Sequence, residues 1–470
     1  MKRLYLFLLL IVTSISIQAQ SLTQRLDSLL NDPMLKTSEV GITVFDLTAG
    51  KSLYQYQDEK LYRPASTEKV ITAVTALARL GEDYTMDTRL QYTGSIENDT
   101  LKGNLYLIGG FDPELMDEDL DSLVDVVARS GIRYISDTLV ADVSMVDSVY
   151  WGKGWSWDDA PDSFQPYLSP LMLNRGCVDV TVIPTQKDSV PEVVCVPVSD
   201  YYQVDNDAVS HQQQAAKLKI TRNWLHQGNR IRVSGNVTKE TTRTLSVYDS
   251  KNFFFHTFVS RLKAKGIEIN AKAFAEYPSN DSLSMAASLF TLRRSLDEVL
   301  RQAMKESDNL CAESMFYHLA AHCGKKKYVS SNDGTDAIYG FMKQVLDFNP
   351  EYYNIVDGSG VSLYNYVSPQ LLLEYLKYAY YHTGIFQPFY DSLPIAGMDG
   401  TLEHRMKKGK AYRNVRAKTG TVKGVSSLAG YAKAPNGHLL AFVIINQNVM
   451  KARQARVWQD KVCEVLCACL

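Results

Sequence analysis

A serine and a lysine three residues apart could do chemistry together if they stand at the start of a helix. Ser66 and Lys69 lie in such a stretch, which continues as an apolar run to Leu80. Pro64 can stiffen the entry and serine is favoured at a helix N-terminus, so the pattern predicts a helix beginning near Ser66. Residues three apart share one face of a helix. The dipole there stabilises an alkoxide and disfavours an ammonium, which suits a serine nucleophile with a lysine base.

Two further polar motifs follow along the chain. They are Ser307-Asp308-Asn309 and Lys418-Thr419-Gly420-Thr421. The first lies inside residues 296–321, which otherwise resemble one helix, and the second leads into an expected strand over 425–431. A Ser-x-x-Lys spacing alone arises often by chance, and its alternative reading is a serine cap followed by a surface lysine. The ordered combination is far rarer, and it resembles the motif set of penicillin-binding proteins and class A β-lactamases.

Four more motifs extend this resemblance over nearly the whole chain. They are GGFDPEL from Gly109, GWSWDD from Gly154, DGSGVS from Asp357 and GMDGTL from Gly397. Together the motifs are similar to those of the penicillin-binding-protein-4 type of D-alanyl-D-alanine carboxypeptidase, the S13 peptidase family. The resemblance implies an α/β fold: a transpeptidase domain like that of serine β-lactamases and penicillin-binding proteins, with a central antiparallel sheet and helices. It also implies a large nested insert of two smaller lobes.

The resemblance implies how acylation would proceed. Ser66 would attack the carbonyl of a D-Ala-D-Ala bond and carry the acyl group, with Lys69 as the base. The backbone N–H groups of Ser66 and Thr421 would form the oxyanion hole. Burial and a second cation, Lys418, would both favour a partly deprotonated Lys69. Which group accepts the first proton stays open in this class.

The other motif residues would handle the leaving group and the substrate. Ser307 would relay a proton to the leaving amine, and Asn309 would hold the substrate amide and Lys69. Lys418, Thr419 and Thr421 suit the terminal carboxylate of D-alanine, because an ammonium and hydroxyls supply the charge and the donors that a carboxylate needs.

Asp159 is the candidate for substrate specificity. It follows tryptophans in the Gly154 motif, and in the resembling family an acidic residue after this motif approaches the site from the insert. A carboxylate there would bind the free amino group of the diamino acid in a peptidoglycan stem peptide. An Asx-type turn is the alternative.

Trp151, Trp155 and Trp157 fit either core packing or substrate lining. The glycines of the Asp357 motif predict a tight turn beside the site.

The spacing of the motifs requires inserted structure. A hairpin over 40–56 leads to the Ser66 helix, but 237 residues then separate Lys69 from Ser307. That is far more than a helix-to-helix connection needs, so we expect an insert with its own core. The expected division is a catalytic domain over 21–86 and 288–470, an inserted α/β lobe over 87–176 and 248–287, and a nested, mainly β lobe over 177–247.

Residues 1–20 resemble a signal peptide rather than part of the fold. Lys2 and Arg3 precede an apolar run over 4–17, and Ala19 offers a small residue for cleavage. We therefore expect an exported, periplasmic protein, with a retained N-terminal anchor as the alternative. The formal net charge of −2 gives no reason to expect a nucleic-acid partner.

The seven cysteines do not suggest a disulfide scaffold, because their number is odd and the chain is large. Cys177 and Cys195 flank an expected strand pair and could form a bridge. Cys311 and Cys323 would lie ~18 Å apart along one helix, too far for a disulfide. No cysteine spacing matches a metal site, so free thiols are favoured and no metal or other cofactor is expected.

The sequence thus favours a carboxypeptidase, an endopeptidase, or both, that acts on peptidoglycan stem peptides. β-Lactams would inhibit such an enzyme covalently. A serine β-lactamase would share the acylation residues, but the long insert argues against it. A non-catalytic penicillin-binding sensor is disfavoured because all three motifs are intact. The sequence predicts no particular oligomeric state.

Overall fold

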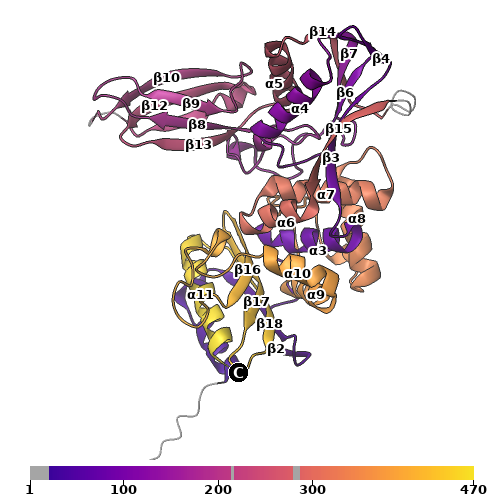
Figure 1. Ribbon diagram of the computed structural model, residues 1–470. Coiled ribbons are helices and arrows are strands. Elements are labelled where there is room, and N and C mark those ends of the chain that lie inside the picture. Colours follow the sequence, from indigo (N-terminus) through magenta and orange to yellow (C-terminus); the bar gives the residue numbers. More distant parts are fainter. Residues whose placement is uncertain (1–20, 213–215, 279–285, 470) are drawn as a thin grey trace, which may run out of the picture.

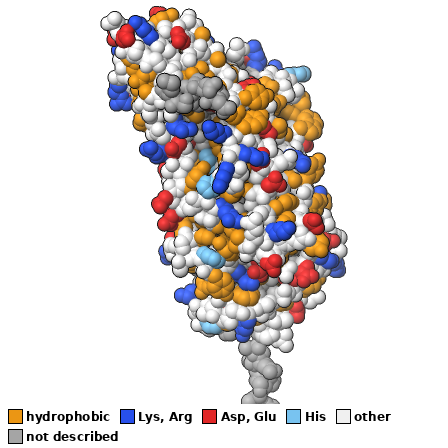
Figure 2. Space-filling model, turned by 90° about the vertical axis from the view of Figure 1, so that its right-hand side faces the viewer, with side chains coloured by type: hydrophobic (Ala, Val, Ile, Leu, Met, Phe, Trp, Pro, Cys, Tyr) orange, Lys and Arg blue, Asp and Glu red, His pale blue; other side chains and the backbone are white. Residues whose placement is uncertain are grey.

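The computed structural model describes residues 21–212, 216–278 and 286–469. The expected signal peptide, residues 1–20, lies outside this range. Within it, no helix is long and apolar enough to cross a membrane. Figure 1 shows one sheet at one end of the molecule, a layer of helices beside it and an insert with further sheets at the far end. On the face seen in Figure 2, acidic and basic side chains are interspersed among the described residues.

A five-stranded antiparallel sheet in the order β16-β17-β18-β1-β2 forms the base of the fold. Its strands are β1 (Glu39–Asp46), β2 (Lys51–Tyr56), β16 (Val415–Val422), β17 (Val425–Lys433) and β18 (Leu439–Gln447). Along β18, alternate residues enter two different cores, so both faces are covered and the strand is one apolar run. Helices α2 (Leu22–Leu29) and α11 (Ala452–Ala468) cover one face. The predicted hairpin over 40–56 is confirmed as β1 and β2, and the predicted strand over 425–431 as β17.

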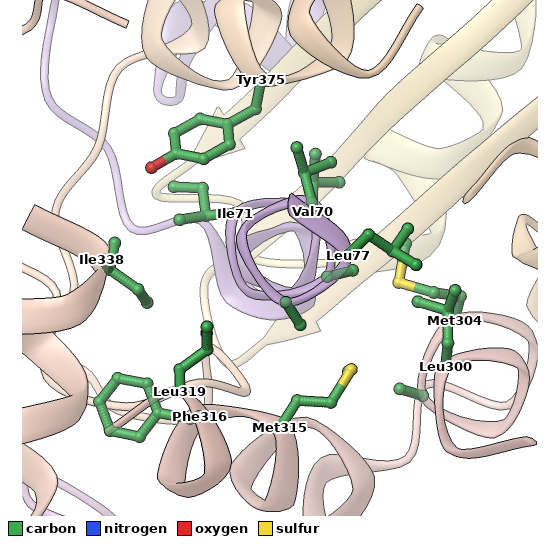
Figure 3. Packing of buried hydrophobic residues seen from close by; sticks show 14 of the residues in the cluster. Val70, Ile71, Leu77, Leu300, Met304, Met315, Phe316, Leu319, Ile338 and Tyr375 are labelled. Carbon is green, nitrogen blue, oxygen red and sulfur yellow. The ribbon is translucent and has the colours of Figure 1, made fainter. Parts of the chain in front are cut away.

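A group of helices covers the other face. They are α3 (Glu68–Leu80), α6 (Leu296–Lys305), α7 (Asn309–Gly324), α8 (Ser331–Val345), α9 (Pro369–Tyr381) and α10 (Thr383–Ser392). Helix α3 is buried on all sides from Glu68 to Leu77. Figure 3 shows its apolar side chains pointing toward residues of four neighbouring helices: Leu300 and Met304 of α6, Met315, Phe316 and Leu319 of α7, Ile338 of α8, and Tyr375 of α9. This packing fixes the position of the Ser66–Lys69 motif at the N-terminus of α3.

Residues 296–321 do not form the single helix expected from the sequence. Helix α6 ends at Lys305, and α7 begins at Asn309 with Asp308 as its N-cap, whose carboxylate accepts the N–H of Cys311 at 2.8 Å. Between them Ser307 adopts a φ of 61°, a left-handed conformation that a non-glycine residue adopts at some energetic cost. The cap and the turn interrupt the helical pattern where the motif lies, so Ser307 projects from a bend.

The insert contains a seven-stranded mixed sheet with two helices on it. Its order is β15-β3-β6-β7-β5-β4, and β14 also pairs with β7. The strands are β3 (Thr85–Tyr92), β4 (Ser95–Glu97), β5 (Thr100–Lys102), β6 (Leu105–Ile108), β7 (Tyr134–Asp142), β14 (Glu268–Ala275) and β15 (Ala287–Ser295); the helices are α4 (Asp117–Arg129) and α5 (Ser250–Ala264). Strand β15 pairs with β3 along its length, so this sheet extends past the expected boundary at residue 288. The division into domains stays a prediction.

Two three-stranded sheets make up the region predicted to be mainly β. One has the order β13-β8-β9 and the other β10-β12-β11. Their bounds are β8 (Cys177–Ile183), β9 (Glu192–Val196), β10 (Gln203–Ser210), β11 (Lys219–Arg222), β12 (Arg230–Val237) and β13 (Thr241–Ser246).

The possible Cys177–Cys195 bridge is not formed. Both cysteines are free, as are the other five. The register of β8 and β9 sets Cys195 opposite Val180, three residues along the strand from Cys177. At ~3.3 Å per residue that offset exceeds disulfide reach. The free thiols agree with the favoured reading of the sequence.

Candidate active site

Ser66 and Lys69 meet at the entry to helix α3, as their spacing predicts. The turn is not a simple serine-capped helix start: Ser66 lies in a 3-10 turn over Ala65–Thr67, and its hydroxyl caps no backbone N–H there. The side chain instead lies 3.0 Å from Lys69 Nζ. That distance lies within the reach of direct proton transfer.

Lys69 has two more neighbours, and both are carbonyl oxygens. Its Nζ donates to Asn309 Oδ1 at 2.6 Å and to the backbone oxygen of Ser359 at 2.7 Å. Neither oxygen can donate in return. A neutral amine has two N–H bonds and one lone pair, so with both N–H groups engaged its lone pair faces the Ser66 hydroxyl. Burial lowers the pKa of Lys69 to about 8, against the opposing charges of Asp357, Asp308 and Glu313, which makes this neutral form accessible.

The second hydroxyl of the site, Ser307, pairs with the second lysine. Lys418 Nζ donates to Ser307 Oγ at 2.8 Å and to the carbonyl of Thr419 at 2.8 Å. The Lys418 side chain is fully buried. Burial has the largest effect on its pKa, the positive charge of Lys69 adds to it, and together they lower the pKa well below the ordinary value. The sequence assigned Lys418 to a substrate carboxylate, and the structure adds this contact with Ser307.

Strand β16 passes directly beside the serine. A side chain at Gly420 would come within 2.9 Å of the backbone nitrogen of Ser66 and 2.2 Å of Ser427 Oγ, so only glycine allows the strand to approach this closely. Thr421 follows on β16 and is exposed. Thr419 donates its hydroxyl hydrogen to Thr401 Oγ1 at 2.8 Å. The strand motif thus lies beside the Ser66 backbone N–H, as an oxyanion site requires.

The carbonyl of Ser359 belongs to a tight loop that sequence reasoning treated only as a turn. Gly360 has a φ of 80°, and a side chain there would meet the carbonyl of Ala65 at 1.9 Å. The carboxylate of Asp357 holds the loop: it accepts the indole N–H of Trp155 at 2.9 Å and the backbone N–H of Gly360 at 2.9 Å. Trp155 is therefore buried in a structural contact, which favours core packing over substrate lining for this tryptophan.

Glu313 also supports this loop, and the sequence analysis missed it. Its carboxyl accepts the backbone N–H groups of Gly358 at 3.3 Å and Ser359 at 2.9 Å. Burial, together with the charge of Asp357, raises its pKa to about 8. Glu313 stands four residues after Asn309, on the same face of α7. An acidic residue on the apolar helix that carries the motif is the signal that could have identified it.

Asp159 lies in a 3-10 turn over Trp157–Asp159 and makes no hydrogen bond with the other predicted site residues. Its carboxylate accepts from Gln165 Nε2 at 3.4 Å. The following segment does reach the site, because the carbonyl of Phe164 accepts the Asn309 side-chain amide at 2.8 Å. Burial raises the pKa of Asp159, and the negative charges of Asp158 and Asp162 raise it further. The positive charge of Lys423 acts in the opposite direction and lowers this pKa. A cation bound there would relieve this unfavourable charge.

A serine beside a buried lysine that can lose its proton is the apparatus of enzymes that form an acyl-serine without a histidine. Combined with the antiparallel sheet, the Ser-Asp-Asn bend and the Lys-Thr-Gly strand, it defines the class of active-site-serine enzymes that penicillin acylates. The chain is similar to members of this class over most of its length.

Residues 22–467 match the model of the D-Ala-D-Ala carboxypeptidase 3 (S13) family. The chain belongs to this family and is a serine-type D-Ala-D-Ala carboxypeptidase by class. Similar proteins include the D-alanyl-D-alanine carboxypeptidase DacB of Haemophilus influenzae, 29% identical over 92% of this chain and 88% of that protein. Another is the D-alanyl-D-alanine carboxypeptidase of an Actinomadura species, 28% identical over 90% of this chain and 80% of that one.

The fold agrees with this assignment. The crystal structure of penicillin-binding protein 4 from Haemophilus influenzae is similar, with a TM-score of 0.78, 26% identity, and coverage of 91% of this chain and 95% of that one. A structure of the same protein complexed with a β-lactam has a TM-score of 0.73 and 25% identity, and covers 93% of this chain and 98% of that one. The predicted family and fold class are confirmed.

Proposed function

We propose that this protein cleaves the D-Ala-D-Ala bond of peptidoglycan stem peptides through an acyl-enzyme at Ser66, and that β-lactams acylate the same oxygen. The observation that carries the proposal is the hydrogen-bonding arrangement of Lys69. Two carbonyl acceptors, on Asn309 and Ser359, leave its lone pair directed at the Ser66 hydroxyl. The amine can therefore take the serine proton as the oxygen attacks.

In the proposed sequence, the Ser66 oxygen forms a bond with the substrate carbonyl carbon and its proton passes to Lys69. The backbone N–H groups of Ser66 and Thr421 stabilise the oxyanion. The bond from carbon to the D-alanine nitrogen then breaks, and Ser307, polarised by Lys418, delivers its proton to that nitrogen. Ser307 regains a proton from the protonated Lys69, so the net transfer moves the Ser66 proton to the leaving amine. Water hydrolyses the acyl ester and restores Ser66.

A single assay on purified protein separates the candidate activities. Release of D-alanine from a pentapeptide, with cephalosporin hydrolysis slower by orders of magnitude, is the expected result. Fast cephalosporin turnover without D-alanine release would instead identify a β-lactamase. Penicillin labelling with neither turnover would identify a sensor. Cleavage of a cross-linked peptide dimer in the same assay measures the endopeptidase activity relative to the carboxypeptidase activity.

Lys418 is proposed to bind the terminal carboxylate. Lys418→Ala is expected to lower kcat/KM for a pentapeptide with a free C-terminal carboxylate by about tenfold to a hundredfold, because a charge-assisted contact is lost. The amidated analogue, which lacks the negative charge, should lose much less. Lys433→Ala, at an exposed lysine at the end of strand β17, serves as the matched control and should affect neither substrate. Equal losses on both substrates would mean that Lys418 acts only through Ser307, its contact in the structure.

Asp159 is proposed to recognise the free amine of the diamino acid. Asp159→Ala should reduce cleavage of peptides with a free side-chain amine by about tenfold or more, the loss of a contact of ~1.5–3 kcal/mol. Penicillin acylation should barely change, because penicillin lacks that amine. Asp158→Ala, at the exposed neighbouring position, is the matched control. Equal losses on N-acetylated and free-amine peptides would show that Asp159 is only structural.

We also propose that the protein acts in the periplasm after cleavage of residues 1–20. Support comes from the basic start and the apolar run of this segment and from a peptidoglycan substrate. Cell fractionation with and without the segment tests the location, and the N-terminal sequence of the exported protein tests the cleavage point.

A further inference from the structure

Tryptophans gather in an open pocket outside the catalytic residues, between the Gly154 motif and the nested β region. The pocket has a volume of ≈ 430 Å³, within the usual range for small-molecule sites. The lining residues that matter here are Tyr150, Trp151, Trp157, Trp224, Leu225 and Gln227. Three of the five tryptophans of the chain therefore meet in this pocket.

The aromatic surface of the pocket is open to solvent. Trp157 is 66% exposed and Leu225 is 65% exposed. The rings of Trp157 and Trp224 lie 5.4 Å apart at 43°, so they form two adjoining walls that come from two different 3-10 turns. Large exposed apolar side chains that cluster on a soluble protein mark a binding surface rather than a core.

A short segment of chain connects the pocket to the proposed peptide site. Trp157 and Asp159 share one 3-10 turn, and the chain then runs to Phe164, whose carbonyl binds Asn309. Seven residues span at most ~25 Å when extended, and successive turns shorten this segment: Asp162 N–H donates to the carbonyl of Asp159 at 2.9 Å, and Gln165 N–H to that of Asp162 at 3.4 Å. The four residues of a stem peptide ahead of the scissile bond extend ~13 Å.

The lining of the pocket favours a neutral occupant. None of the residues that line it carries a formal charge. A phosphate or an anionic lipid headgroup would therefore find no cationic partner among the lining side chains. N-acetylated sugar rings are uncharged, and their C–H faces carry the partial positive charge that fits the negative face of an aromatic ring.

From this geometry we infer that the Trp157–Trp224 pocket binds an N-acetylated hexosamine ring of the glycan strand to which the stem peptide is attached. The inference rests on the proposed function, because it assumes that the peptide end of the same substrate lies at Ser66. The pocket would then select peptides still joined to glycan over free peptides.

Kinetics with two substrates test this inference. Wild-type protein should show a kcat/KM about tenfold higher for a disaccharide-linked pentapeptide than for the free pentapeptide, and Trp224→Ala should reduce this ratio to about one. Leu225→Ser, at an exposed position that needs no repacking, should lower the ratio in the same direction. Tyr277→Ala is the matched control: Tyr277 is 67% exposed and its ring lies 5.7 Å from that of Tyr328, so it removes an equivalent exposed aromatic elsewhere and should keep the ratio.

A binding measurement separates this inference from the proposed activity. Titration of the inert Ser66→Ala protein with a tetramer of N-acetylglucosamine should give a saturable change in tryptophan fluorescence that Trp224→Ala abolishes. A ratio near one for the wild type together with no saturable change would overturn the glycan site, even if the free pentapeptide is cleaved. Glycan binding without cleavage of either peptide would uphold the pocket and reject the proposed activity. Saturable binding of anionic vesicles in place of the tetramer would assign the pocket to a membrane surface and overturn the inference.

Discussion

Ser66→Ala is expected to abolish covalent labelling by a fluorescent penicillin and to lower D-alanine release by about 10⁵-fold or more, because no other atom can carry the acyl group. The fold should survive. The Ser66 side chain is only half-buried and its hydroxyl bonds only to Lys69 among the described residues. Losing one such hydrogen bond costs ~1 kcal/mol, so the melting temperature should shift by less than about 4 °C.

The matched control for this experiment is Ser359→Ala. Ser359 is the serine of the Asp357 loop, and its fully buried hydroxyl bonds Asp357 at 3.3 Å. The contact that matters to Lys69 comes from its backbone carbonyl, which alanine retains. Labelling should therefore persist in Ser359→Ala. Labelling that persisted in Ser66→Ala and disappeared in Ser359→Ala would transfer the nucleophile to the loop.

Lys69→Met is expected to slow penicillin acylation by about 10³-fold, in the range of a lost general base. Methionine has nearly the same shape without the amine, so it fills the space at little packing cost. The wild-type rate should rise with pH and reach half of its maximum near pH 8. Burial lowers the pKa of Lys69 to about 8, and only the neutral amine, whose fraction grows as pH increases through that pKa, can accept the serine proton.

Glu313 requires a separate control, because burial raises its pKa to about 8 as well. Glu313→Gln removes the titrating carboxyl and keeps an oxygen that can accept a backbone N–H. The pH step should persist in Glu313→Gln if it belongs to Lys69. A step that vanished there, or a rate that fell as pH rose through 8, would remove Lys69 from its role as base. Acylation of Lys69→Met within tenfold of the wild type would point to the Ser307–Lys418 pair.

Local chemistry made much of the fold predictable. Ser368 caps helix α9 through the N–H of Leu371, with Pro369 at the first position, and a serine followed by proline is a local signal of a helix start. The apolar run along β18 is typical of a strand that is covered on both faces. Where the prediction of one helix over 296–321 was wrong, the apolar pattern concealed the cap at Asp308 and the left-handed turn at Ser307. Backbone strain of this kind depends on surrounding packing and leaves no periodic signal.

The sequence by itself determined which side chains can do chemistry and the short spacings between them. Ser66 and Lys69 are three residues apart, and a helical turn suffices to bring them together. Only the tertiary structure decided what surrounds the amine. The carbonyl of Ser359 lies 290 residues along the chain from Lys69, and the amide of Asn309 lies 240 residues away. Contacts at such separations depend on how α3, α7 and the Asp357 loop pack, because side-chain types and local spacing do not encode distance between remote elements.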